Sequence, residues 1–296
     1  MAAFPVPRYL AETATREPAV REWLGSIPDI VASLGARWSL TVGEPFQPGG
    51  QCSWTAPATD GSGQSVVLKV AFRFPSSEER DEGAGLKTWD GNGAVRLHAD
   101  TEGESFYGLL MERCLPGTTL AELLPEPEQD VVVARLLQRL WSPSHEASAF
   151  RPLAAMCAAW ADEFEAEYAA APAADRLDPG LARAGIALFR DLPRSADSEA
   201  LLCTDLHAGN ILAATREPWL VIDPKPYVGD PTYDVLQHML NCDRRLATDA
   251  AGLADRMAGL AELDSGRVRL WLFARAVQES VGSPVLRRVA TQLAPR

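Results

Sequence analysis

The sequence of 296 residues lacks long hydrophobic runs. No stretch approaches the roughly 18 uninterrupted apolar residues that a transmembrane helix needs, so we expect no membrane partner. The N-terminus (MAAFPVPRYLAETATREP) lacks a basic start followed by an apolar run, so we expect no signal peptide and a cytoplasmic protein. The five cysteines form no Cys-x-x-Cys pair, which argues against a disulfide framework and a structural zinc site.

Lysine is also scarce, because only Lys69, Lys87 and Lys225 stand among 28 basic residues. Positions that keep lysine where arginine is so strongly preferred invite a chemical explanation. The formal net charge of −12 argues against nucleic acid as the main partner. Residues 114–242 hold 19 acidic and 9 basic groups, whereas residues 243–296 hold 6 and 9, so the middle of the chain is its acidic part.

What is present predicts two lobes of an α+β fold, a small antiparallel-sheet lobe with one helix over 1–113 and a larger, mostly helical lobe over 114–296. In the first lobe, strands are predicted over 37–46, 54–56, 65–74, 94–99 and 106–113. Its helix is predicted to start within 75–79, with Ser as the N-cap, and to end near Trp89. In the second lobe, helices are predicted over 118–124, 128–141, 152–170, 178–191, 231–240, 245–261 and 265–280, and a short hairpin over 211–222.

Lys69 lies in the middle of the apolar run Val66–Phe72. A lysine there either reaches solvent from an edge strand or meets an anion, because an unpaired buried ammonium is costly. On this feature alone the two alternatives are balanced. In the second, Lys69 binds phosphate and is held by a carboxylate of the following helix. Glu78, Glu79 and Glu82 are the candidates, and Glu82 lies one helical turn before Leu86.

Two glycine turns lie near this lysine in the sequence. Gly49 and Gly50 would let backbone N–H groups approach a phosphate, although on this feature alone an ordinary hairpin turn is the better explanation. The turn Asp60-Gly61-Ser62-Gly63 has the composition of a plain hairpin. A Walker-type GxxxxGK[ST] loop is absent.

The strongest constellation is Asp205-Leu-His-Ala-Gly-Asn210, followed by Asp223 after a predicted hairpin. Phosphoryl transfer needs a carboxylate that accepts the proton of the attacking hydroxyl, and it needs oxygen ligands for magnesium. Either half alone could be a polar loop that caps helices. Both halves together, preceded in the chain by a glycine turn and Lys69, predict a phosphotransferase.

The motifs TDLHAGN, VIDPK and GDPTYD resemble the signature of the aminoglycoside phosphotransferase family. Within it they are similar to the branch of aminoglycoside 6-phosphotransferases and hydroxyurea phosphotransferases. PGGQCSW, VLKV, LKTWDGNGAVRL and WLFARAVQ support that branch, and the likeness runs from about Glu44 to Gln278. The resemblance implies a protein-kinase-like fold that uses ATP and Mg²⁺ to phosphorylate a small-molecule acceptor.

The resemblance also implies a role for each matching residue. Asp205 would be the catalytic base, with Asn210 and Asp223 as the metal ligands. Lys69 would contact the nucleotide phosphates and pair with Glu82. The remaining nucleotide-binding positions would be Gly49, Gly50 and Ser53 over the phosphates and a hinge of Met111, Glu112 and Cys114 at the adenine. Asp230 and Asp234 would buttress the loops and cap a helix.

Three positions depart from the family pattern. Cys203 stands where the family usually has histidine, and Thr204 replaces the usual glycine. Lys225 replaces a glycine, which fits this branch; it would meet a phosphate or pair with Asp223, and we favour the pairing. His98, His145 and His238 lack ligand-like spacing and are expected to be surface or packed residues, and His207 is expected to structure its loop.

The acceptor is left open. Asp162, Glu163, Glu165 and Glu167 on one helix form either a solvated face or a cleft wall that attracts a cationic antibiotic. Arg267, Arg269, Arg275, Arg287 and Arg288 would repel a polycation if they lined that cleft. The leading hypothesis is an ATP-dependent O-phosphotransferase, expected to be a monomer, that inactivates an aminoglycoside of the streptomycin type. The alternatives are transfer to hydroxyurea or another metabolite, and a nucleotide-binding pseudokinase.

Overall fold

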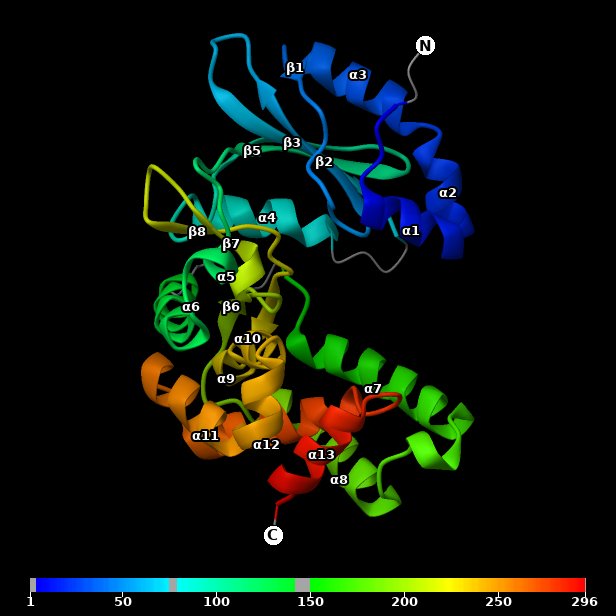
Figure 1. Cartoon of the computed structure of the whole chain (residues 1–296), viewed down its shortest axis with the longest axis vertical. Coiled ribbons are helices and arrows are strands. Elements are labelled where there is room, and N and C mark those ends of the chain that lie inside the picture. The colour runs from blue at the N-terminus through cyan, green and yellow to red at the C-terminus, as the bar shows by residue number, and fades with distance from the viewer. Residues whose placement is uncertain (1–3, 75–78, 142–149, 296) are drawn as a thin grey trace. The chain divides into compact units, whose positions relative to one another are not determined.

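The structure is a computed structural model that describes residues 4–74, 79–141 and 150–295. The chain divides into two compact units (Figure 1). Unit 1 contains residues 1–117 together with 214–220, and unit 2 contains residues 118–213 and 221–296. The expected helix start at 75–78 and His145 lie outside the described residues.

Unit 1 is built on a five-stranded antiparallel sheet with the order β1-β2-β3-β5-β4. Its strands are β1 (Thr41–Val42), β2 (Ser53–Thr59), β3 (Ser65–Phe72), β4 (Leu97–Glu102) and β5 (Phe106–Glu112). β3 lies in the interior of this sheet, between β2 and β5. Asp60 accepts N–H groups of Ser62 and Gln64 in the β2–β3 turn, so the hairpin predicted there is confirmed.

Three helices at the N-terminus were not predicted: α1 (Arg8–Arg16), α2 (Pro18–Leu24) and α3 (Ile27–Arg37). They bury Leu10, Val20, Trp23 and Ile27 against one face of β2 and β3. The strand predicted over 37–46 is correspondingly wrong, because only β1 is extended and Arg37 ends α3. Proline in the first turn of α2 and of α3 is a helix-start signal that could have revealed them.

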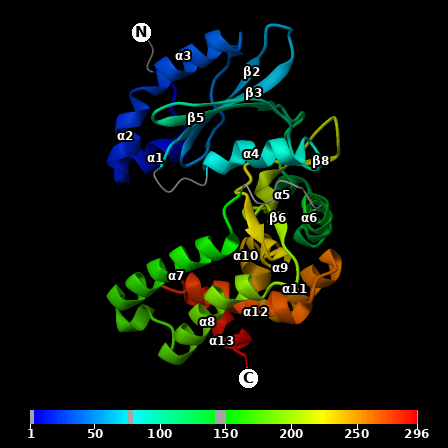
Figure 2. The same ribbon diagram turned by 180° about the vertical axis from the view of Figure 1, so that it is seen from behind.

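The opposite face of the sheet carries α4 (Glu79–Trp89), as the two views show (Figures 1 and 2). Neighbouring side chains of a strand point to opposite faces. Leu68 and Val70 therefore join the core under α1–α3, whereas Lys69 points toward α4. Alternation along β3 thus places one lysine inside the unit.

Unit 2 is mostly helical. Its helices are α5 (Leu120–Leu123), α6 (Glu126–Leu140), α7 (Leu153–Ala170), α8 (Pro179–Asp191), α9 (Pro231–Asp234), α10 (Leu236–Leu240), α11 (Asp243–Ala261), α12 (Ser265–Gln278) and α13 (Pro284–Leu293). α12 lies at the centre and packs against α8, α11 and α13, with Trp271 and Phe273 fully buried. The helices predicted from the sequence end at residue 280, so α13 was not among them.

Four short strands interrupt the helices: β6 (Ala200–Leu202), β7 (Ile211–Ala213), β8 (Trp219–Val221) and β9 (Tyr227–Gly229). β6 pairs with β9, and β7 pairs with β8 in the predicted hairpin. The α+β fold predicted from the sequence is confirmed, with an antiparallel sheet and a mostly helical remainder. Over the described ranges, no helix is both long enough and apolar enough to cross a bilayer.

Candidate active site

Lys69 and Glu82 form a buried ion pair in unit 1. Lys69 Nζ lies 2.6 Å from Glu82 Oε2, and the side chains are 8% and 0% exposed. Lys69 comes from an interior strand, so the interpretation as an edge-strand lysine that reaches solvent is wrong. Glu78 lies outside the described residues, and Glu82 is the carboxylate that the structure places on Lys69. Removing one partner of such a pair leaves a buried charge, which typically costs about 3–5 kcal/mol.

The glycine turn before β2 is tightly packed. Gly49 has φ +75°, and a Cβ there would lie 2.4 Å from Cβ of Pro7. A Cβ on Gly50 would lie 2.8 Å from Oγ of the buried Ser53. Close packing and the left-handed backbone therefore require glycine at position 49, whereas a Cβ at position 50 would displace only the Ser53 hydroxyl.

The predicted hinge lies at the end of β5. Met111 and Cys114 are buried, and burial raises the pKa of the Cys114 thiol to about 12. The backbone N–H of Glu112 donates to the Arg96 carbonyl at 2.8 Å, so this group is not available to a bound base. The Glu112 carboxylate accepts two hydrogen bonds from Arg216, at 2.8 and 2.9 Å.

Arg216 was not singled out from the sequence. It lies between β7 and β8, in the segment 214–220 that belongs to unit 1. Besides Glu112, its guanidinium donates to the carbonyls of Gly91 and Ala94 and to the Glu217 carboxylate. These five contacts match the five N–H donors of an arginine. Its partners at the hinge are more than one hundred residues away in the sequence, so local patterning carried no signal for it.

Unit 2 holds the loop of Asp205. Asn210 Nδ2 donates to the Asp205 carbonyl at 3.0 Å, and it lies 3.5 Å from the Asp205 carboxylate. His207 Nδ1 accepts the N–H of Gly209 at 3.1 Å, and burial lowers the pKa of this imidazole. The neutral ring that this acceptor role requires is therefore favoured. The loop-structuring role expected for His207 is confirmed.

Asp223 reaches the same end of the β7–β8 hairpin. The N–H of Ile222 donates to the Asn210 carbonyl at 2.9 Å, so Asn210 and Asp223 are neighbours across the hairpin. Asn210 uses its Nδ2 internally, which leaves its Oδ1 as the atom for a cation. An amide oxygen and a carboxylate on one hairpin fit the oxygen ligands that Mg²⁺ prefers. Lys225 Nζ lies 2.7 Å from Asp223 Oδ1, so the pairing that we favoured is present.

Asp234 binds the backbone of the two residues that precede Asp205. Its carboxylate accepts the backbone N–H groups of Cys203 at 2.9 Å and Thr204 at 2.6 Å, and Nε1–H of Trp141 at 2.8 Å. Burial raises its pKa to about 6, against the lowering by these hydrogen bonds. Cys203 itself is fully buried, and burial raises the pKa of its thiol. At the position where the family usually has histidine, this chain therefore has a buried cysteine that packs in the core, and its backbone N–H makes the contact with Asp234. Trp141 was not predicted.

Asp230 has the expected capping role. It accepts the N–H of Thr232 at 2.9 Å at the start of α9, and it also accepts Nε–H of Arg267 at 2.5 Å and Nε1–H of Trp271 at 2.8 Å. Other arginines named in the C-terminal part bind carboxylates as well, namely Arg269 with Asp255, Arg275 with Glu279 and Arg287 with Asp175. Four of the five arginines named there are therefore ion-paired within the protein.

The acidic stretch of α7 is partly neutralised. Arg190 of α8 lies 2.6 Å from both Asp162 and Glu165. All four acidic side chains named for this helix are exposed. Half of the proposed wall is therefore bound to a cation of the same unit.

A buried cluster of Asp130, His238 and Cys242 has the residue types of a metal site. However, Asp130 accepts from His238 and Arg245 on Oδ1, and from Arg245 and Arg256 on Oδ2. A carboxylate offers about four lone pairs, so this one is fully used. The cluster joins α6 to α10 and α11, which confirms His238 as a packed histidine; His98 is exposed, as expected.

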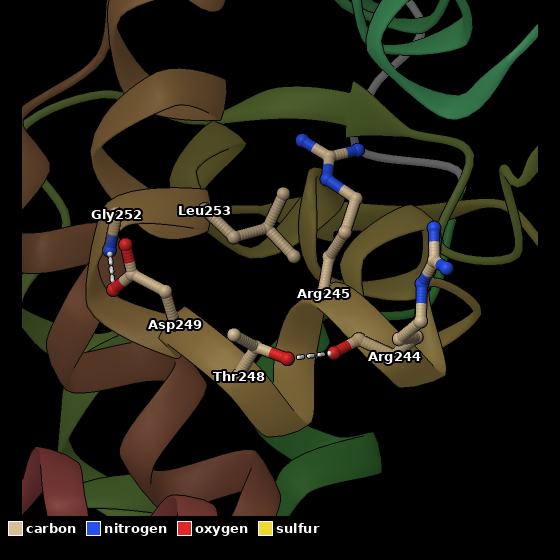
Figure 3. A pocket seen from close by; sticks show the side chains of 6 residues that line it. All are labelled: Arg244, Arg245, Thr248, Asp249, Gly252 and Leu253. Atoms are coloured by element: carbon tan, nitrogen blue, oxygen red, sulfur yellow. Dashed lines mark hydrogen bonds between the residues drawn. The ribbon is translucent and has the colours of Figure 1, made fainter.

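Next to this cluster, a pocket of about 430 Å³ opens on α11 (Figure 3). Asp249 breaks the helix there with φ −151° and ψ 76°, and its carboxylate caps the next turn at the N–H of Gly252. None of the pocket residues was predicted. They are Arg244, Arg245, Thr248, Asp249, Gly252 and Leu253.

Residues 37–283 match the family model described as aminoglycoside/hydroxyurea antibiotic resistance kinase. The chain belongs to this family. It is 34% identical to a hydroxyurea phosphotransferase of Kitasatospora aureofaciens, over 94% of this chain and 79% of that protein. It is also 34% identical to a streptomycin 6-kinase of Streptomyces griseus, over 93% of this chain and 90% of that protein.

Solved structures agree on the fold. An aminoglycoside phosphotransferase APH(4)-Ia mutant in ternary complex with AMP-PNP and hygromycin B matches with a TM-score of 0.60 at 15% identity. That match covers 90% of this chain and 97% of the other. APH(3'')-Id of Streptomyces rimosus gives a TM-score of 0.55 at 18% identity, covering 90% and 98%. At these identities the likeness shows the kinase-like fold alone, and it confirms the fold expected from the motifs.

Proposed function

We propose that this protein transfers the γ-phosphoryl group of ATP to a hydroxyl of a small-molecule antibiotic, most simply an aminoglycoside of the streptomycin type. The observation that carries the proposal is the hairpin that joins Asn210 to Asp223 directly beside Asp205, in a member of an antibiotic resistance kinase family. The acceptor oxygen would bond to the γ-phosphorus while the bond to the β–γ bridging oxygen breaks. ADP leaves, and the hydroxyl proton passes to the Asp205 carboxylate.

In this proposal residues 1–113 form the nucleotide-binding lobe. Lys69, held by Glu82, contacts the nucleotide phosphates, since a pre-paired ammonium needs no further ordering. Gly49, Gly50 and Ser53 lie over the phosphates, and the backbone near Met111, Glu112 and Cys114 meets the adenine. Because the Glu112 N–H is already used, base recognition falls to its neighbours.

Residues 114–296 form the catalytic and acceptor lobe. Asn210 and Asp223 would hold Mg²⁺, which would neutralise phosphate charge when bound. Asp205 orients the acceptor hydroxyl, and Asp234 and Trp141 keep the preceding backbone in place. A single chain supplies all these groups, so we propose that the protein is a monomer and that, as a user of ATP, it acts in the cytoplasm.

Hydroxyurea is the alternative acceptor. Arg190 already neutralises Asp162 and Glu165, and this reduces the acidic surface that a polycation would need. A small neutral acceptor needs no such surface. The hydroxyurea phosphotransferase relative is as similar as the streptomycin 6-kinase, so both acceptors belong in the test.

The test is Mg²⁺-dependent ADP release with streptomycin, other aminoglycosides, hydroxyurea and simple sugars as acceptors. We expect one acceptor to give a strong signal that Asp205→Asn abolishes, with an unchanged melting temperature in the variant. Retained turnover in Asp205→Asn would contradict the catalytic role. ATP binding without ADP release from any acceptor would favour the pseudokinase alternative.

A further inference from the structure

Lys225 holds its ammonium directly on a carboxylate oxygen that we assign to the metal. Nζ lies 2.7 Å from Asp223 Oδ1, and the two side chains are 17% and 39% exposed. Mg²⁺ binds carboxylate oxygens at about 2.0–2.1 Å. An ammonium and a divalent ion in contact with the same oxygen would repel each other strongly at that separation.

The backbone of Lys225 is fixed on both sides. Its N–H donates to the Cys203 carbonyl at 2.9 Å, and its own carbonyl accepts Oγ1–H of Thr204 at 2.5 Å. The same Cys203 carbonyl also accepts the N–H of Asp205 at 2.8 Å. The lysine is therefore anchored to the segment that carries Asp205, and only its side chain is able to move away from Asp223.

We propose that Lys225 is a tethered cation that competes with divalent metal for Asp223. Without nucleotide, its ammonium neutralises Asp223 and weakens the binding of the metal. When a nucleotide is bound, its phosphates offer the ammonium another anion, and Asp223 becomes available to the ion. Metal and nucleotide then strengthen each other's binding, as linkage between two ligands requires. This inference rests on the proposed function, because it takes Asp223 as a metal ligand.

The competition also explains why lysine is kept here in a chain that otherwise prefers arginine. An ammonium is a compact point charge, and that of Lys225 contacts one oxygen of Asp223, Oδ1. A guanidinium is a planar fork that binds both oxygens of a carboxylate at once. Arginine at this position would therefore occupy the whole carboxylate and oppose the metal more strongly than lysine does.

The experiment is a titration of the full-length protein with Mn²⁺ in the absence of nucleotide, with the free ion measured by electron paramagnetic resonance. We expect Lys225→Met to bind Mn²⁺ about fivefold more tightly than wild type, the size of effect set by a partly exposed ion pair. Lys225→Arg is expected to bind it more weakly than wild type. Saturation with AMP-PNP should strengthen Mn²⁺ binding of wild type more than that of Lys225→Met.

Two control variants separate the possible failures. Lys87→Met removes another ion-paired lysine, 2.8 Å from Asp100, and should leave Mn²⁺ binding unchanged. Asp223→Asn should abolish the binding. If Asp223→Asn binds Mn²⁺ like wild type, the metal assignment within the proposed function is wrong. If Asp223→Asn loses the ion while Lys225→Met binds it no more tightly than wild type, only the competition is overturned.

Discussion

Thr204 donates its backbone N–H to the Asp234 carboxylate at 2.6 Å while holding a left-handed conformation with φ +52°. A β-branched residue in this region is a strained outlier, since Cβ crowds the backbone. The contact with Asp234 and the hydroxyl bond to the Lys225 carbonyl together hold Thr204 in that conformation. Glycine, the usual family residue, would adopt it without strain.

Substitutions of Thr204 should therefore follow an order. Thr204→Val keeps the crowded Cβ and loses the hydroxyl bond to Lys225, so it should lower the free energy of unfolding by about 1 kcal/mol. Thr204→Gly loses the same bond but is relieved of strain of about 1–2 kcal/mol. We expect the glycine variant to be the more stable of the two in urea unfolding. The reverse order would mean that the backbone is not strained at this residue.

Asp234→Asn should destabilise the protein by about 2–3 kcal/mol at pH 5, because the NH₂ group that replaces one carboxylate oxygen opposes one or two of the three N–H groups that donate to Asp234. The cost should depend on pH. The pKa of Asp234 is raised to about 6 in the folded protein, above its usual value of 3.8. Its contribution to stability is therefore full below the usual value and is lost as pH rises through about 6.

The difference in unfolding free energy between wild type and Asp234→Asn should accordingly shrink from pH 4 to pH 7. A shift of this size corresponds to at most about 3 kcal/mol. Urea unfolding of both proteins at each pH measures it. A difference that grows with pH would show that the hydrogen bonds outweigh burial and hold the pKa low.

Two arginine variants contrast a half-buried network with an exposed one. Arg216→Ala removes five hydrogen bonds and leaves Glu112, which is 17% exposed, without this counter-charge. We expect a loss of about 3 kcal/mol. Arg190→Ala removes two ion pairs with carboxylates that are 75% and 56% exposed, and it should cost less than about 1 kcal/mol.

At acidic pH, the difference between the stability losses of Arg216→Ala and Arg190→Ala should become smaller. Hydrogen bonds from Arg216 and Arg96, opposed by burial, hold the pKa of Glu112 below its usual 4.5. The stabilisation is thus present above the usual value and is lost as pH falls through the lowered one. Thermal melts of both variants at pH 7 and pH 3 would test this. Equal losses at pH 7 would contradict the network.

One thiol should react much faster than the other four. Cys114, Cys157, Cys203 and Cys242 are buried, and burial raises the pKa of each thiol, whereas Cys52 is partly exposed. Because the thiolate is the reactive species, a maleimide should modify one equivalent rapidly under native conditions. Cys52→Ser should remove that phase. A rapid phase that survives in Cys52→Ser would show that another cysteine opens to solvent.

Sequence patterns predicted those parts of the fold in which the functional residues and the residues that position them are close together in the sequence. The strand around Lys69 and the hairpin between Asn210 and Asp223 could be read from neighbouring residues, and the capping role of Asp230 was implied by the resemblance of its motif to the family signature. The helices α1 and α2 were not predicted because they are short, with 9 and 7 residues. Helices of this length contain too few turns for a helical repeat of apolar residues to stand out from the sequence of the strands that follow.

Contacts between distant segments were beyond such patterns. Trp141 reaches Asp234 across 93 residues, and Arg216 reaches Gly91 across 125. No periodicity records which far segment satisfies a donor, because that choice is made by tertiary packing. The same holds for the cluster of Asp130, His238 and Cys242. Its residue types suggest a metal site, but hydrogen bonds from Arg245 and Arg256 occupy the Asp130 carboxylate.

The segment 214–220 gives the chain a topology with three crossings between units, after residues 117, 213 and 220. Unit 1 is therefore not a contiguous module. A fragment ending at Gly117 would lack Arg216 and would leave the Glu112 carboxylate and the Gly91 and Ala94 carbonyls without their arginine donor. Swapping nucleotide lobes between relatives should consequently succeed only when this seven-residue segment is transplanted with the lobe, as one discontinuous cassette.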